Sequence, residues 1–419
     1  MNVARLVVVV TFTFSGAVKL NDPLGTAYKL QDYAQAFGLQ ALMQGVTPVV
    51  LSVVLAMLEF SVGIYLLFGI RRRRTSILAL AFMLAFTPLT LYLAVANPVG
   101  DCGCFGDALV LTNWQTFWKN VVLLAAAILL VCKTRLMTRL ITERHQWTVS
   151  LCTWAFSLIF AGMSLYGLPP IDFLPYRIGV NLREKLAERD AAQGQTKTYF
   201  IMEKNGERRE FATEDYPDST WTYIDTRVEG TQSSAESPYA DFCMQTADGE
   251  DLTGEVMQDT SYVFLLLSPY LEQADDGVLD IITSAYDYAQ EHGYRFYCLT
   301  SSGRETIATW QEMTGAEYPF LFTDGIVLKT MIRSNPGLML LHDGRITGKW
   351  PSTGMPDLTE EVRPLEQTEW GALEGPSRME RLLTILFRSV LPLLACTLAD
   401  RLWVAWKLRK RHKPNTNSK

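Results

Sequence analysis

The sequence predicts a multi-pass α-helical membrane bundle of about six transmembrane helices, together with an α/β domain on the outer side of the membrane. Three observations predict this fold. Six apolar runs approach or exceed the roughly 20 residues that a helix needs to cross a bilayer. Basic residues gather in the short connections between these runs. The long polar segment between the last two runs alternates strand-like and helix-like patterns.

The apolar runs define the membrane half of the chain. The first run follows Arg5 and contains "SGA", features that a secretory signal peptide also has. Only one charge precedes it, however, and it continues into an amphipathic stretch, so we expect a retained helix. The expected membrane helices are 4–20, 48–70, 76–96, 117–132, 147–168 and 381–408.

The orientation follows from three basic segments, "RRRR" (71–74), "KTRLMTRLITERH" (133–145) and "KLRKRHK" (407–413). Because basic loops stay in the cytoplasm, both termini are expected there. The "CGCFG" loop and the polar middle (about 169–378) then lie outside the cytoplasm. In a bacterium this compartment is the periplasm, where disulfides form. The sequence therefore predicts a multi-pass protein of the bacterial inner membrane.

Polar residues in the membrane half mark its outer edge and its interior. The "DP" at 22–23 is a helix-start signature, and apolar residues recur at helical spacing after it. This pattern predicts a short helix that lies on the membrane surface or caps the bundle. Glu59 lies near the middle of the second span, where a carboxylate is costly and usually faces a polar partner. Its role is left open between a hydrogen bond to a neighbouring helix and redox or proton handling. We interpret Arg388, Asp400 and Arg401 of the last span as interface anchors.

The stretch "NPVGDCGCFGD" (97–107) places Cys102 and Cys104 one residue apart between two spans. Gly103 permits the sharp bend that a disulfide between them requires. Such a small ring is expected to be strained, which makes a disulfide a better oxidant. The alternatives are a free pair, half of a metal site that lacks further ligands, and a staple that removes little chain entropy. We favour thiol–disulfide exchange, with the electrons passing to a lipid-soluble carrier such as a quinone or to a second protein.

The polar middle is predicted to have two parts, 169–237 and 238–378. The first part has a helix-like segment, "NLREKLAERDAA", and strand-like segments, "TKTYFIM" and "STWTYIDT". The second part begins with a hairpin turning at 248–249 and the buried strand "SYVFLLLS". A helix ending at Gly293, the strand "YRFYCLT", the helix "RETIATWQEMTG" and a hairpin turning at 343–344 follow. This order predicts a mixed sheet with helices packed against it.

The second part resembles the thioredoxin-like domain of periplasmic thiol–disulfide proteins. The resemblance rests on the hairpin "YADFCMQTADGEDLT" and on Pro336, which stands where that family has a cis-proline before its fourth strand. The resemblance implies that Asn335, Pro336 and Gly337 border a groove that binds a partner or client protein.

This domain departs from the family at its active thiols. The strand "VFLLLS" should run into a Trp-Cys-x-x-Cys helix start, but "PYLEQADDG" follows it instead. Cys243 and Cys298 lie within apolar, strand-like patterns, where a thiol is most often a small core hydrophobe. Without a thiolate at a helix N-terminus there is no reactive nucleophile. The domain is therefore predicted to be redox-silent and to act in docking.

The membrane half resembles two related families. "DCGCFGD" after an Asn-Pro looks like the signature loop of the methylamine-utilisation protein MauE family, and "FTFSGAVKLNDP" and "EFSVGIYLLFG" look like the first two helices of DoxX-type membrane proteins. The resemblance covers about 1–133. It implies a four-helix bundle tied to periplasmic disulfide formation or thiol–disulfide transfer, with Cys102 and Cys104 as the redox pair.

Two functional hypotheses follow. The first is a membrane thiol–disulfide oxidoreductase in which Cys102 and Cys104 act, Glu59 tunes or shuttles protons, and the thioredoxin-like domain presents a client. The second is a non-enzymatic scaffold that holds a partner in an envelope complex. Nucleic-acid binding is not expected, because no soluble face combines clustered basic residues with aromatics, and the scattered histidines predict no metal site. The predicted layout is 1–146 (bundle), 147–168 (fifth helix), 169–237, 238–378, and 379–419 (last helix and basic tail).

Overall fold

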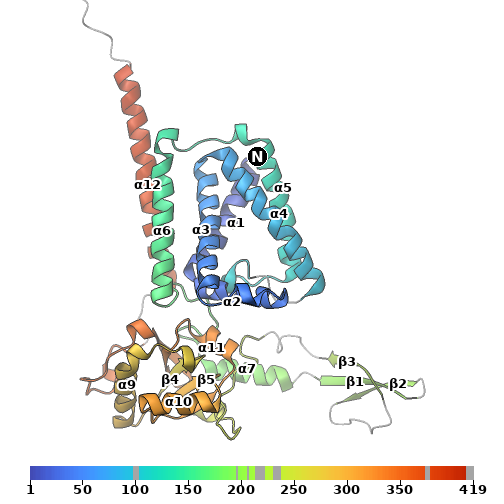
Figure 1. Ribbon diagram of the computed structural model, residues 1–419, viewed down its shortest axis with the longest axis vertical. Coiled ribbons are helices and arrows are strands. Elements are labelled where there is room, and N and C mark those ends of the chain that lie inside the picture. The colour runs from blue at the N-terminus through green and yellow to red at the C-terminus, as the bar shows by residue number, and fades with distance from the viewer. Residues whose placement is uncertain are drawn as a thin grey trace, which may run out of the picture. The chain divides into compact units, whose positions relative to one another are not determined.

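The computed structural model describes residues 1–97, 103–194, 197–204, 207–212, 222–229, 237–372 and 378–411 (Figure 1). The chain divides into two compact units. The membrane unit comprises Met1–Phe173 and Gly375–Lys419, and the soluble unit comprises Leu174–Glu374. The predicted finer layout of five segments stays a prediction.

Six helices within the described residues are long and apolar enough to cross a membrane, which confirms the six predicted spans. They have few interior breakers, and their apolar side chains face both the bundle and its surroundings, as expected for helices that lie in lipid. These helices are α1 (Asn2–Asn21), α3 (Thr47–Phe68), α4 (Arg72–Ala96), α5 (Asn113–Cys132), α6 (Gln146–Tyr166) and α12 (Arg378–Arg411).

The predicted short helix after the first span is confirmed as α2 (Pro23–Ala36), which lies crosswise at one end of the bundle (Figure 1). Asp22 begins it, because its carboxylate accepts a hydrogen bond of 2.8 Å from the backbone N–H of Gly25. Pro23 follows in the first turn, where a missing N–H costs nothing. We call this end of the membrane unit the α2 end. Short 3₁₀ turns at Gln40–Leu42, Gly106–Ala108, Thr134–Leu136 and Glu143–His145 complete the unit's connections.

Helices α1 and α3 cross at unusually short range, because a glycine of each faces the other backbone. A Cβ atom at Gly16 would lie 2.4 Å from the backbone N of Phe60, and one at Gly63 would lie 2.7 Å from the backbone N of Thr13. Small residues at such a crossing are how membrane helices gain close packing. At the far end of α1, the Arg5 guanidinium donates 2.8 Å hydrogen bonds to the final carbonyls of α3, those of Leu66 and Leu67.

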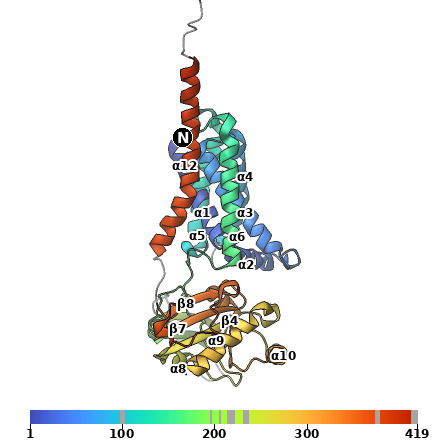
Figure 2. The same cartoon turned by 90° about the vertical axis from the view of Figure 1, so that its left-hand side faces the viewer.

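Helix α12 packs against α6, and both views show the two side by side along part of their length (Figure 2). The sulfurs of Cys152 and Cys396 are 3.9 Å apart. Asp400 accepts from Thr142 at 2.5 Å and lies 2.7 Å from Nδ1 of His145. The interpretation of Asp400 as an interface anchor was therefore wrong, because its carboxylate is buried and ties α12 to the start of α6.

The soluble unit is built around a mixed five-stranded sheet of order β6-β5-β4-β7-β8. Strands β4, β5 and β6 are parallel, while β7 is antiparallel to β4 and β8 is antiparallel to β7. The central strand β4 is buried along its whole length, as its unbroken apolar sequence predicts. The strands are β4 (Tyr262–Ser268), β5 (Arg295–Thr300), β6 (Phe320–Phe322), β7 (Gly337–His342) and β8 (Arg345–Pro351).

Helices cover this sheet, and α9 lies against the face formed by β4 and β7 (Figure 2). Its predicted end is confirmed, since Gly293 adopts φ +70° just beyond it. The predicted hairpin between β7 and β8 is also confirmed, with Asp343 and Gly344 at φ +50° and +70°, as a type I′ turn requires. The strand β6 and the helix α11 were not predicted. The helices are α8 (Thr253–Gln258), α9 (Leu279–Glu291), α10 (Arg304–Thr314) and α11 (Gly325–Met331).

The segment before this sheet is joined to it by α7 (Leu182–Gly194). The N–H of Leu182 donates to the carbonyl of Gly344 at 2.7 Å, and Arg183 pairs with Asp343 at 2.8 Å. The start of α7, which belongs to the predicted first part, therefore packs on the hairpin of the second. A separate three-stranded antiparallel sheet has the order β2-β1-β3, with β1 (Lys197–Lys204), β2 (Glu207–Ala212) and β3 (Thr222–Glu229).

Candidate functional site

From Gly103 onward, the loop that carries Cys104 folds against the α2 end of the membrane unit. Cys102 lies outside the described residues, and the described part begins at Gly103. Gly103 and Gly106 have φ values of +60° and +51°, which favour glycine. A Cβ at Gly103 would lie 3.2 Å from Cγ of Lys29, and one at Gly106 would lie 3.2 Å from Cγ1 of Val18. Both glycines of "CGCFG" are therefore required by conformation and by close packing.

Both ends of this connection are fixed to helices. Before the loop, the Asn113 amide donates to Oδ1 of Asn97 at 2.8 Å, which joins the start of α5 to the end of α4. After the cysteine, the Phe105 ring is buried, with an edge-to-face contact to Phe14 at 5.3 Å between centroids. The Lys119 ammonium lies 4.1 Å from the centroid of the same ring. The position of Cys104 is thus set by α1 and α5.

The carbonyl oxygen of Cys104 contacts two polar side chains of α1. It lies 2.8 Å from Oγ of Ser15 and 3.2 Å from Nζ of Lys19. Ser15 and Lys19 are four residues apart, so they lie on one face of the helix. The backbone of the candidate redox residue is therefore held by a lysine inside the bundle.

Lys19 forms a buried ion pair with Glu59 of α3. Nζ of Lys19 lies 2.7 Å from Oε2 of Glu59, and the two residues are 7% and 6% exposed. The ammonium has three hydrogens, and it has three acceptors in Glu59, Ser15 (2.8 Å) and the Cys104 carbonyl. The charge is thus fully hydrogen-bonded, which a buried ion needs in order to be tolerated.

Ser15 connects the ion pair to the loop a second time. Its hydroxyl lies 2.7 Å from Oε2 of Glu59 and 2.8 Å from the Cys104 carbonyl. A hydroxyl has a single hydrogen, so it can donate to only one of these oxygens at a time. The arrangement offers two hydrogen-bond states, one bonded to the carboxylate and one bonded to the loop.

Of the predicted site residues in the membrane unit, the structure brings Glu59 and Cys104 together through Ser15 and Lys19. Sequence reasoning missed these two linking residues, although both lie in the quoted motif "FTFSGAVKLNDP". A signal for them existed. Lys19 is the lone lysine of the first span, and a buried carboxylate elsewhere in the membrane predicts a cationic partner.

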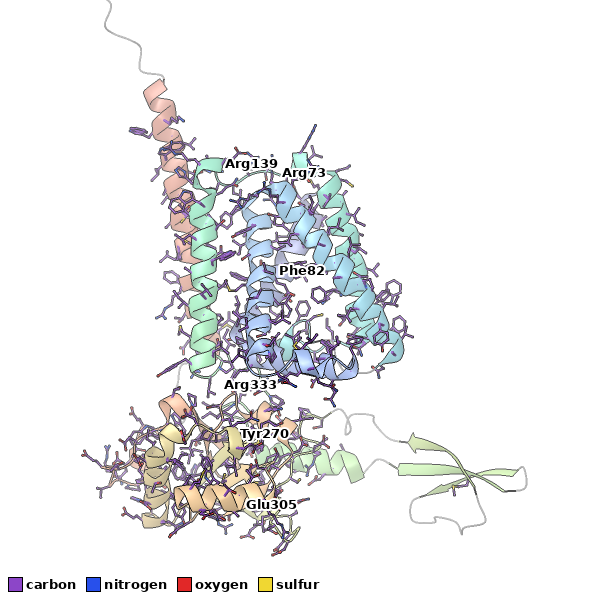
Figure 3. The ribbon with its side chains drawn as sticks, viewed as in Figure 1. Arg73, Phe82, Arg139, Tyr270, Glu305 and Arg333 are labelled. Atoms are coloured by element: carbon purple, nitrogen blue, oxygen red, sulfur yellow. The ribbon has the colours of Figure 1, made fainter. Side chains whose placement is uncertain are left out.

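A cavity of about 140 Å³ adjoins this cluster within the membrane unit. Its wall is formed by α1 to α5 and by the loop at Gly103 and Cys104. Figure 3 shows Phe82, one of its lining residues, in the interior of the bundle between the ribbons of α3 and α4. The cavity is mostly apolar, with the Lys19–Glu59 pair at its polar part.

The predicted partner-binding segment lies in the soluble unit, directly before β7. The Asn335–Pro336 peptide bond is cis. The Asn335 amide donates to the carbonyl of Tyr270 at 2.8 Å and accepts from Ser268 at 2.7 Å. Tyr270 stands just after β4 and is labelled in Figure 3. The cis-proline segment and the end of β4 are therefore joined by the Asn335 side chain, and no cysteine lies between 244 and 297.

The two thiols of the soluble unit are poor nucleophiles. Cys298 is fully buried in β5, and burial raises the pKa of its thiol. Burial, and next the nearby Asp251 carboxylate, raises the pKa of the Cys243 thiol. Both thiols stay protonated at neutral pH, so they lack the thiolate needed for exchange. Among the described residues there is also no group of three or more His, Cys, Asp or Glu side chains arranged to hold a metal.

We expect Cys298 to resist iodoacetamide in the folded protein at pH 8, whereas the exposed Cys132 reacts within minutes. The raised pKa also sets a pH dependence. An unfolded thiol loses its proton near pH 8.5, before the folded one does, so this contribution to stability is complete below that pH and falls above it. Mass spectrometry of alkylated peptides, and urea midpoints of the full chain at pH 7.5 and 10, measure both effects. Equal alkylation rates for Cys298 and Cys132 would contradict the burial.

Comparisons with protein families match two segments of the chain. Residues 1–133 match the MauE family. The matching family is described as methylamine utilisation protein MauE, and the match covers α1 to α5 with Ser15, Lys19, Glu59 and Cys104. Residues 196–229, which contain β1 to β3, match a domain of unknown function, DUF8463. The predicted likeness to DoxX-type proteins stays a prediction.

A solved structure is weakly similar to part of the chain. The solution structure of a proposed protein disulfide isomerase from Bacteroides thetaiotaomicron matches with 14% identity and a TM-score of 0.23, over 27% of this chain and 76% of that one. No curated protein matches the chain.

Proposed function

We propose that this chain is a membrane thiol–disulfide oxidoreductase whose Cys102 and Cys104 exchange a disulfide with a protein client on the periplasmic side of the bacterial inner membrane. The observation that carries the proposal is the contact of the buried Lys19–Glu59 pair with the Cys104 carbonyl. A loop needed only as a connection has no reason to rest on an ion pair inside a bundle, where charges are costly.

The exchange conserves atoms and electrons. A thiolate of a reduced client attacks the Cys102–Cys104 disulfide, forms a mixed disulfide and releases one cysteine of the pair. The client's second thiolate then attacks the mixed disulfide, which leaves the client oxidised and both cysteines reduced. The released thiolates need two protons. Glu59 and Ser15, which lie within hydrogen-bond distance of each other at the Cys104 backbone, are placed to tune or relay them.

The arginines at the end of the membrane unit opposite α2 support the proposed orientation. Arg73 and Arg139 lie at this end (Figure 3), and together with Arg71, Arg72, Arg74 and Arg135 they line one pocket. Basic clusters of this kind are retained in the cytoplasm. The α2 end with Cys104 then faces the periplasm, where a disulfide persists.

The soluble unit is proposed to be a thioredoxin-like docking module for the client. Its mixed sheet of order β6-β5-β4-β7-β8 supports this assignment. Asn335, Pro336 and Gly337 are the proposed contact segment. The two unreactive thiols of the unit fit a module that positions a client without exchanging electrons with it.

Trapping experiments test the oxidoreductase. Intact cells are quenched with acid and treated with a thiol-alkylating mass tag, which reports the redox state of Cys102 and Cys104. A Cys104→Ala chain should accumulate mixed disulfides with clients through Cys102, or Cys102→Ala should do so through Cys104. Cys132→Ser, which changes an exposed thiol at the far end of α5, is the matched control and should trap nothing. A pair that stays reduced, with no client trapped by either variant, would reject the enzyme.

A scaffold is the second candidate, favoured by the absence of cysteine after β4 and by the protonated thiols of the soluble unit. In that case the chain holds a partner in an envelope complex through its soluble unit. The double variant Cys102→Ala/Cys104→Ala would then support cell growth as well as the original chain does, and the same partner proteins would co-purify with it.

A further inference from the structure

We propose that the cavity beside Cys104 binds the ring of a quinone, which takes the electrons of the cysteine pair. This inference rests on the proposed exchange function and names its electron acceptor. Its starting point is the place of the cavity, since Gly103 and Cys104 form part of the wall together with Lys19 and Glu59. A ligand there lies against both the redox loop and the buried ion pair.

The size and lining of the cavity fit a single aromatic-sized ring. Its volume of about 140 Å³ is close to the ~150 Å³ of an apolar cavity that holds benzene. Most of the wall is apolar and suits the flat faces of a ring: Phe12, Phe82, Met83, Phe86, Leu89 and Leu123. Three of these side chains, Phe82, Met83 and Phe86, lie on one turn of α4, and the Phe12 and Phe82 rings meet edge to face at 6.0 Å.

Polar groups enter the wall from two sets of helices. Lys19 and Glu59 come from α1 and α3, whereas Lys119 and Asn120 come from α5. A quinone has a carbonyl oxygen on opposite edges of its ring, and each oxygen needs a hydrogen-bond donor and, during reduction, a proton. The Lys19 ammonium already has three acceptors, so the donors for the ring come from α5: the Lys119 ammonium and the Asn120 amide, which gives one of its two hydrogens to Thr90 at 3.2 Å. Glu59 and Ser15 are placed to pass protons.

The redox step balances without another reactant. The reduced pair loses two electrons and two protons as both S–H bonds break and the S–S bond forms. The quinone gains the same two electrons and two protons as its carbonyl oxygens become the hydroxyls of a quinol. The pair returns to the oxidised state that accepts electrons from the next client, and the quinol leaves into the bilayer that surrounds the helices.

The test uses the purified full-length chain in lipid nanodiscs. The pair is reduced with dithiothreitol, excess reductant is removed, and ubiquinone-1 is added; a parallel sample receives the naphthoquinone menadione. We expect one quinol formed per chain with at least one of the two probes, together with loss of the two alkylatable thiols. Met83→Trp fills the cavity and should slow quinone reduction at least about tenfold, whereas oxidation of dithiothreitol by the oxidised pair should stay within about twofold.

Two further variants keep the result interpretable. Leu158→Trp adds the same ring to α6 at a residue that is 55% exposed, and it should reduce quinone at the original rate. Leu89→Trp fills the cavity from another turn of α4, and it replaces Met83→Trp in the same measurement if that variant does not fold. A pair that oxidises dithiothreitol but reduces neither quinone, or a filled cavity that leaves the rate unchanged, overturns the quinone site alone. The quinone site is also overturned if an acyl chain co-purifies with the protein, and Met83→Trp and Leu89→Trp both displace it without changing the rate of quinone reduction. A pair that exchanges with no thiol rejects the proposed function itself.

Discussion

Replacing Glu59 with leucine should lower the free energy of unfolding of the membrane unit by about 3–5 kcal/mol, because it leaves the Lys19 ammonium buried without its anion. Lys19 is 7% exposed, and its remaining acceptors are the neutral Ser15 hydroxyl and the Cys104 carbonyl. Unfolding in mixed micelles with increasing SDS, followed by tryptophan fluorescence, measures the loss. We expect disulfide exchange with a client to fall along with stability.

The double variant Lys19→Met/Glu59→Leu separates a structural role from a chemical one. Replacing both members of a buried ion pair by apolar residues is often neutral or stabilising, so stability should return to near the original value. The proposed exchange activity should stay low, because the contact with the Cys104 carbonyl and the carboxylate proposed to handle protons are both gone. If activity returns with stability, the pair only holds the helices together.

Gly63→Val should destabilise the membrane unit by about 3 kcal/mol or more, since the added side chain collides with the facing helix. Its Cβ alone would lie 2.3 Å from Oγ1 of Thr13 and 2.7 Å from the backbone N of that residue. Backbone cannot move aside as a flexible side chain can, so α1 and α3 must separate. The same separation pulls Lys19 away from Glu59, and disulfide exchange should fall as well.

Gly162→Val is the matched control for this crossing. Gly162 lies in α6, also a membrane helix, and a Cβ there would have no heavy atom within 4 Å. The cost of placing valine in a helix is common to both variants, so the difference between their SDS midpoints isolates the collision. Equal midpoints would show that α1 and α3 do not cross at Gly63 as the structure has it.

The elements that the sequence predicted well are those with a strong local signal. Unbroken apolar runs located all six membrane helices, Asp22 and Pro23 located the start of α2, and Gly293 located the end of α9. Each of these signals is physical and short-range, since it depends on hydropathy or on one capping residue. The strand β6 has only three residues, Phe320–Phe322. It forms because its backbone pairs with β5, so no local sequence pattern predicts it.

The candidate site was predicted only in part, because its decisive contacts join distant positions. Glu59 and Cys104 were named from their own chemistry, but a sequence does not say which residues of other helices face them. Lys19 is 40 positions from Glu59 and 85 from Cys104. The three-dimensional structure explains the two helix motifs "FTFSGAVKLNDP" and "EFSVGIYLLFG" together. Gly16 and Gly63 allow α1 and α3 to approach closely, and Lys19 and Glu59 form their ion pair beside that crossing.

The ion pair between α1 and α3 has a consequence for biogenesis. A carboxylate halfway along a span cannot reach the lipid head groups, so α3 inserted by itself would carry an unpaired anion into hydrocarbon at a cost of a few kcal/mol. Lys19 lies near the end of α1, so its flexible side chain can extend to the lipid head groups until α3 is inserted. Because ribosomes make α1 first, the cation is already in the membrane when the anion arrives. Co-translational insertion of α3 is therefore expected to depend on α1 remaining beside the translocon.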